Sequence, residues 1–128
     1  MRLLLDTHAL LWSVLDHPHL SRAARAALSD PDIEILISAI SIFEITLKHR
    51  LGKLQQADSF VRHHARILAE LEWTPLPVTV GHASLAGSLD IEHKDPFDRL
   101  LIAQARIERL PIVSNEAIFD AFGVERIW

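Results

Sequence analysis

The strongest constraint on this 128-residue chain is its alternation of short apolar segments with longer segments of helical spacing. Short runs of Leu, Ile and Val bounded by turn residues are typical of strands buried on both faces. We expect strands within Arg2–Leu5, Ile33–Ile37, Pro75–Val80, Ile112–Val113 and Val124–Trp128. We expect helices over Thr7–Leu15, Ser21–Leu28, Ser41–Leu51, Asp58–Trp73, His82–Ser88 and Pro96–Leu110, with a helical turn over Glu116–Phe122. This order predicts an α/β fold: one domain over residues 1–128, with a central parallel sheet of four or five strands and helices on both faces.

The composition of the chain bears on its core, on disulfides and on its cellular compartment. Hydrophobic residues make up 49% of the chain, which supports a packed core, and the absence of cysteine excludes disulfides and thiolate metal sites. The first residues are not typical of a signal peptide, and no stretch approaches the roughly 20 apolar residues that span a bilayer. We therefore expect a soluble cytoplasmic protein that does not enter a membrane.

The net charge of −4 bears on possible ligands. A protein that holds nucleic acid through phosphate contacts alone is usually basic. An acidic chain remains compatible with a nuclease if a bound divalent cation supplies positive charge locally.

Two acids lie within three residues of the end of a predicted strand. Asp6 comes after Leu3–Leu5, and Glu116 comes three residues after Val113. Each also has a structural explanation, since Asp6 can cap the next helix, as Thr7 can, and Glu116 can be a first-turn helix acid. In open parallel sheets, ligands bind beyond the carboxyl ends of the strands, so both acids are also site candidates.

Glu44 lies within the predicted helix over Ser41–Leu51. Ser41 and Glu44 have the spacing of a capping box, in which Ser is the N-cap and Glu is the third helical residue. Glu44 also precedes Lys48 by four residues, which favours a surface ion pair. Its neighbours in sequence are apolar, however, so the carboxylate faces either solvent or a buried polar site.

Asp95 and Asp98 open the predicted helix over Pro96–Leu110. Asp95 suits the N-cap, Pro96 the first helical position and Asp98 the third. Asp95 is well explained as a cap. Asp98 has a structural explanation as well, because an acid in the first turn opposes the helix dipole.

The joint placement of these acids at one edge of the sheet favours a cation site. Carboxylates held close together raise one another's pKa, and a divalent cation removes that repulsion. Oxygen ligands without thiols select Mg²⁺ or Mn²⁺, and the histidines form no zinc motif, since His63 and His64 are adjacent on a helix and face different ways. Such a cation activates water and offsets charge on a phosphate under attack, which is the chemistry of a phosphodiesterase.

Several segments resemble the PIN domain family, and most closely the VapC-type toxins of bacterial toxin–antitoxin pairs. The segments are Leu4–His8 (Leu-Leu-Asp-Thr-His), Ser41–Glu44 (Ser-Ile-Phe-Glu), His93–Ala105, which is the most specific, and the ending from Ile112–Glu116 through Phe119 to Phe122–Val124. The resemblance covers the whole chain. It implies a Rossmann-like parallel sheet of four or five strands and Mg²⁺- or Mn²⁺-dependent endoribonuclease activity. It also implies a small cognate antitoxin that blocks the acidic groove, and a homodimer.

The resemblance also assigns site residues by position. Asp6, Glu44 and Asp98 match the acidic core, with Asp6 and Asp98 on the principal metal and Glu44 orienting the attacking water or sharing a metal. Asp95 is a neighbouring acid with a less defined role. Many members have Asp after the fourth strand where this chain has Asn115–Glu116. Glu116 aligns with that Asp, so we expect it to be an outer ligand that contacts the metal through a water molecule.

Other side chains are weaker candidates. Lys48, Arg50, Lys53 and Arg99 could contact phosphate, although solvated helix charges explain each of them as well. Trp12, Phe43 and Leu47 could line an apolar groove for an antitoxin or a second subunit, or belong to the core. For Phe43 we favour the core. The RNA target depends on groove shape, which the sequence does not reveal.

Two other functions remain open. A phosphohydrolase acting on small phosphate esters also places Asp after the first strand, but the haloacid-dehalogenase-type pattern needs a second Asp where this chain has His8. A non-catalytic binding domain of the same fold is the other alternative, although the core acids are present.

Overall fold

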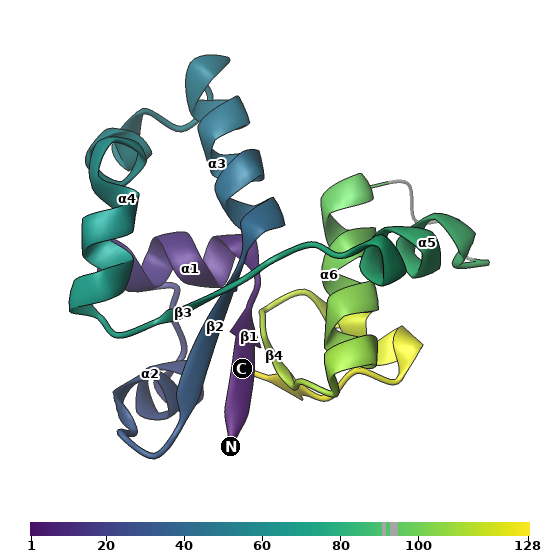
Figure 1. Cartoon of the computed structure of the whole chain (residues 1–128). Coiled ribbons are helices and arrows are strands. Elements are labelled where there is room, and N and C mark those ends of the chain that lie inside the picture. The colour runs from purple at the N-terminus through teal and green to yellow at the C-terminus, as the bar shows by residue number, and fades with distance from the viewer. Residues whose placement is uncertain (91, 93–94) are drawn as a thin grey trace.

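The computed structural model describes every residue except 91 and 93–94, and it has a five-stranded sheet at its centre (Figure 1). The strands are β1 (Arg2–Leu5), β2 (Glu34–Ser38), β3 (Thr74–Leu76), β4 (Ile112–Val113) and β5 (Arg126–Ile127). Their order is β3-β2-β1-β4-β5, and every pairing is parallel. The prediction of an α/β fold with a parallel sheet is confirmed. His93 and Lys94, part of the segment that carries the family resemblance, lie outside the described residues.

Six α-helices and two 3₁₀ helices are described around this sheet. The elements are α1 (Thr7–Val14), α2 (Arg22–Ser29), α3 (Ala39–Arg50), η1 (Gln55–Ala57), α4 (Asp58–Glu70), α5 (Val80–Ser88), α6 (Pro96–Glu108) and η2 (Ala117–Phe122). The helix η1 was not predicted, and the other helices lie on the predicted segments with ends shifted by a few residues. None of the described helices is both long and apolar enough to cross a membrane.

Strand residues alternate between two separate cores, as the pleat of a strand requires. Leu3 and Leu5 of β1 pack with residues of α1, α2, α3 and α4 on one face of the sheet. Leu4 points to the opposite face, where it packs with residues of α6 and η2. Figure 1 shows the same division, with α1 to α4 on one side of the sheet and α5 and α6 on the other. Helices therefore cover both faces, and the carboxyl edge of the sheet is left for side chains that follow the strands.

The start of α3 differs from the prediction. The helix begins at Ala39, and its N-cap is Ser38, whose Oγ accepts a hydrogen bond of 3.1 Å from the backbone N–H of Ile40. Strand β2 runs to Ser38 and passes into the helix without a loop, so Ser41 is already inside the first turn. The predicted capping box of Ser41 and Glu44 is therefore wrong, and Glu44 lies in the second turn, where no cap explains it.

A candidate metal centre at the carboxyl edge of the sheet

Asp6 occupies the junction between β1 and α1. Its backbone N–H donates to the carbonyl of Val113 in β4 at 3.1 Å, and its Oδ1 accepts from the backbone N–H of Ala9 at 2.7 Å. Asp6 rather than Thr7 is thus the N-cap of α1. A cap is usually solvated, but this residue is only 3% exposed. Burial of a charge is costly unless it is compensated, so capping does not account for the whole environment of Asp6.

The buried position of Asp6 perturbs its acidity. The pKa of Asp6 is raised from 3.8 to about 6, chiefly by burial and also by the negative charge of Glu116, although hydrogen bonds from Ser114 and Ala9 lower it. The Ser114 hydroxyl also accepts from the backbone N–H of Glu116 at 2.9 Å, so it joins the two acidic positions. A buried carboxylate beside a second negative charge is a position that a cation would stabilise.

Glu116 lies just after β4 and faces His8 of α1. His8 Nδ1 and Glu116 Oε1 are 3.1 Å apart. The hydrogen bond with Glu116 raises the pKa of His8, and the charges of Asp6, Glu116 and Glu44 raise it as well, whereas burial lowers it. The structure therefore brings three of the predicted acids, Asp6, Glu44 and Glu116, into electrostatic range of one imidazole.

Glu44 projects from α3 and is 6% exposed. Its carboxylate forms the predicted ion pair with Lys48, one turn later on the helix. Lys48 Nζ also lies over the ring of Phe97 in α6, 5.9 Å from its centroid, and that ring contacts Phe43 of α3. Phe43 is 56% exposed, so its predicted core position is wrong: the ring lies on the outer side of α3, against α6.

The two acids of α6 differ in what they do. Asp95 is the N-cap, as predicted, and its Oδ1 accepts from the backbone N–H groups of Phe97 at 2.9 Å and Asp98 at 3.2 Å. Its carboxylate is thus turned onto its own helix. Asp98 is half-buried in the first turn, adjacent to Phe97, the residue that contacts α3. Asp95 therefore fixes the first turn of α6, which carries Asp98.

The donor set fits a hard divalent cation better than zinc. The Ser114 hydroxyl and the Glu116 carboxylate both act on Asp6, and the chain has no cysteine. In the part of the chain that the structure describes, no three His, Asp or Glu side chains form a ready-made metal site. Mg²⁺ does not require one, since it keeps several waters and is held by one or two carboxylates. Two of the acids instead pair with side chains of the protein itself, Glu44 with Lys48 and Glu116 with His8.

Arg99 links helices α5 and α6 through hydrogen bonds. Its guanidinium donates to the carbonyls of Ala86 at 2.9 Å, Gly87 at 3.3 Å and Leu89 at 2.8 Å. These carbonyls belong to the end of α5, where a helix leaves its last acceptors unsatisfied. Arg99 therefore fastens α5 to α6, and of the predicted phosphate contacts it is the one with the clearest structural explanation.

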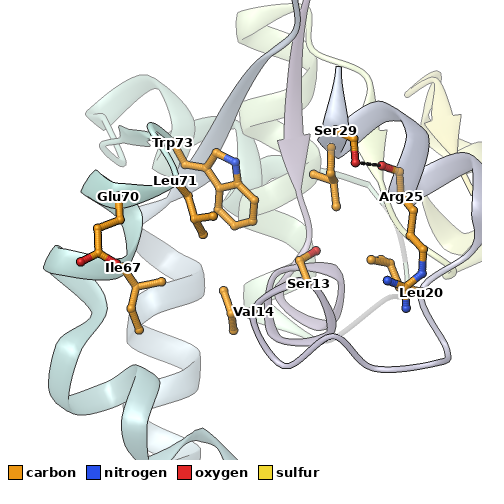
Figure 2. A pocket seen from close by; sticks show the side chains of 10 residues that line it. Ser13, Val14, Leu20, Arg25, Ser29, Ile67, Glu70, Leu71 and Trp73 are labelled. Carbon is orange, nitrogen blue, oxygen red and sulfur yellow. Dashed lines mark hydrogen bonds between the residues drawn. The ribbon is translucent and has the colours of Figure 1, made fainter. Parts of the chain in front are cut away.

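An open pocket of about 490 Å³ lies away from the candidate acids, between the end of α1, helix α2 and the end of α4. Figure 2 shows Leu71 and Trp73 on one side of this hollow and Leu20 and Arg25 on the other. Its lining is mostly apolar, and none of the five candidate acids takes part.

Two side chains at the site were missed in the sequence. Ser114, which hydrogen-bonds Asp6, follows β4 and is fully buried, so its place after a strand was an available signal. His8 was considered as part of the segment that resembles PIN domains and as evidence against a phosphohydrolase, but not as a site residue. Its position two residues after Asp6 and four before Trp12 puts it on the same helical face as that tryptophan, but its contact with Glu116, 108 residues away, has no local signal.

Comparisons with known proteins agree with the fold. The family model named PIN domain matches residues 3–125. VapBC2 from Rickettsia felis, solved bound to a DNA fragment from its promoter, is 18% identical, with 100% of each chain covered and a TM-score of 0.72. FitAcB from Neisseria gonorrhoeae is 21% identical over 98% of this chain and 96% of that one, with a TM-score of 0.67. A toxin–antitoxin complex from Klebsiella pneumoniae is 19% identical over 90% and 87%, with a TM-score of 0.60. No curated protein matches the chain.

Proposed function

The chain belongs to the PIN domain family, and we propose that it is a Mg²⁺- or Mn²⁺-dependent endoribonuclease that serves as the toxin of a toxin–antitoxin pair. The observation that carries this proposal is Asp6, a buried carboxyl with a pKa raised to about 6, beside the charge of Glu116 at the carboxyl edge of the sheet. Such a pairing is unfavourable in the bare protein and becomes favourable around a cation.

We assign the chain's own residues as follows. Asp6 and Asp98 hold the principal metal, Glu44 orients the attacking water or shares a metal, and Glu116 is an outer ligand. Asp95 acts through its cap, which sets the first turn of α6 and so the position of Asp98. When bound, the cation supplies Lewis acidity and lowers the pKa of a water molecule. Lys48, paired with Glu44, brings positive charge to the place where a phosphate would lie.

The first test is cleavage of RNA by the purified protein. Single-stranded RNA should be cut internally with Mg²⁺ or Mn²⁺ present, and a chelator should stop the reaction until metal is restored. A small phosphate ester, assayed in parallel, distinguishes the alternative: hydrolysis of the ester without RNA cleavage would indicate a phosphohydrolase. Mn²⁺ binding without hydrolysis of either substrate would indicate a binding domain.

The proposed partner is a small antitoxin, with two copies of the chain forming a homodimer in the cytoplasm. Support comes from the solved relatives, among them VapBC2 and a toxin–antitoxin complex, although their low identity establishes the fold alone. The site is acidic, so a basic side chain of a partner could neutralise it.

Expression in bacteria tests the toxin role. We expect induction of the chain alone to arrest growth, and co-expression of the small protein encoded beside it to restore growth. Sequencing of RNA ends after brief induction would give the cleavage site. Normal growth with abundant, folded protein would contradict the toxin role, while leaving the in vitro nuclease assay to decide the chemistry.

A further inference from the structure

We propose that His8 is a positioning residue: held against the ring of Trp12, it fixes the Glu116 carboxylate beside Asp6, where Glu116 completes the oxygen ligands of a divalent cation. This inference rests on the metal-dependent function proposed above. It adds His8 to the five candidate acids as a residue that acts on metal binding. It also explains how a glutamate at position 116 can bind the metal where many family members have an aspartate.

The geometry begins with the stacked pair. The rings of His8 and Trp12 are one helical turn apart on α1, with centroids 5.5 Å apart and planes inclined by 15°. His8 Nδ1 then meets Glu116 Oε1 at 3.1 Å. Although the side chain of His8 is 51% exposed, its orientation is set from both sides, by an aromatic face and by a carboxylate.

Trp12 is itself held in place by other rings. Its centroid lies 5.7 Å from that of Trp128, 5.8 Å from that of His17 and 5.4 Å from that of His19. Stacked and edge-to-face ring contacts of this kind favour a defined relative orientation of the rings. Trp12 therefore gives His8 a fixed support rather than a mobile neighbour.

Glutamate needs such support more than aspartate does. Its side chain has one more rotatable bond, so ordering a glutamate side chain costs more conformational entropy. Ser114 holds the backbone of Glu116 through the 2.9 Å hydrogen bond to its N–H. His8 holds the other end of the residue, so backbone and carboxylate are both set before a cation arrives.

The hydrogen bond leaves the carboxylate able to bind a cation. An ionised carboxylate offers about four acceptor positions, and His8 uses one of them. Groups that hydrogen-bond a metal-binding carboxylate typically change metal affinity 10- to 100-fold when removed. His8 is placed to act in this way, because it touches Glu116 and is itself only two residues from Asp6.

The test is Mn²⁺ affinity at pH 8, measured by calorimetry on the full chain without RNA. His8→Ala should weaken Mn²⁺ binding about 10-fold. His8→Asn, whose amide nitrogen can stand near Nδ1, should recover part of the loss, and His8→Phe, which keeps the stacking but has no donor, should not. His64→Ala is the control, because the ring of His64 packs against Phe60 within α4 and not against Trp12, and this variant should bind Mn²⁺ like the wild type. Circular dichroism would verify that each variant is folded.

A double-mutant cycle with Glu116→Ala tests whether His8 affects Mn²⁺ affinity through the Glu116 carboxylate. His8→Ala should cause no further loss of Mn²⁺ affinity once the Glu116 carboxylate is gone. The inference is overturned if His8→Ala leaves affinity within twofold of wild type, tightens binding, or weakens it equally in the Glu116→Ala background. It is also overturned if His8→Ala slows RNA cleavage without changing Mn²⁺ affinity, since His8 would then act on RNA directly. Mn²⁺ binding that depends on His8 in a protein that cuts no RNA would refute the proposed function and leave this inference standing.

Discussion

Asp6→Asn is expected to make the metal-free protein more stable at pH 8, by about 3 kcal/mol at most, although it removes a central residue of the site. The free-energy estimate follows from the rise of the Asp6 pKa from 3.8 to about 6, at about 1.4 kcal/mol per pKa unit. Asparagine keeps the cap of α1, because its side-chain carbonyl can accept from the N–H of Ala9 as the carboxylate does. The substitution therefore removes the buried charge and little else.

The pH dependence of this effect has a definite sign. The folded protein holds the Asp6 proton more tightly than the unfolded chain does, so the wild type loses stability as the pH rises from about 3.8 to about 6. Below this window Asp6 is protonated in both states, and the advantage of Asn should vanish. Above it the advantage should be constant.

Chemical unfolding in the presence of a chelator at pH 4, 5, 6 and 8 measures this difference. Asp120→Asn is the control with the opposite sign, since its exposed carboxylate pairs with Arg126, which lowers its pKa. That variant should gain nothing at pH 8. Mn²⁺ should then raise the stability of the wild type but not of Asp6→Asn. An Asp6→Asn protein less stable than wild type at pH 8 would mean that the carboxylate is compensated within the fold and has no need of a cation.

The fold was predictable because each strand carries its own signal. Leu3, Leu4 and Leu5 of β1 are apolar and point alternately to two cores, so both faces had to be covered, which favours a parallel sheet. The start of α3 was not predictable from spacing alone. Ser38 and Ser41 are both good caps, and the choice between them depended on how far β2 extends through its pairing with β1 and β3.

Some features of the candidate site could likewise be predicted from local sequence, and others could not. The positions of Asp6, Asp95 and Asp98 follow from local rules for strand ends and helix starts. The burial of Asp6 and the contact between His8 and Glu116 depend on β4 pairing with β1, which no local pattern encodes. Phe43 was misassigned for a related reason, because an apolar helix residue can face a neighbouring helix at the surface as well as the core.

Asp98→Asn should reduce RNA cleavage at least about 100-fold, as removal of one charge-stabilising group from a catalytic site typically does. Two roles compete for this residue. As a first-turn acid, Asp98 opposes the dipole of α6, a contribution of about 0.3–1 kcal/mol to stability. As a metal ligand, Asp98 would contribute little to the free energy of unfolding and much to the rate of RNA cleavage. The two roles therefore differ in whether the loss falls on stability or on rate.

Asp58→Asn is the matched control for this choice. Asp58 is the first-turn acid of α4, a helix of 13 residues like α6, and it is ion-paired with His49 at 3.1 Å and Arg62 at 3.0 Å. Both variants should lose a similar, small amount of stability in chemical unfolding. Single-turnover cleavage with saturating Mn²⁺ should fall only for Asp98→Asn. Cleavage by Asp98→Asn within threefold of wild type would mean that Asp98 is structural and does not bind the metal. The metal would then have to be held by Asp6 with Glu44 or Glu116, which the bare site pairs with Lys48 and His8.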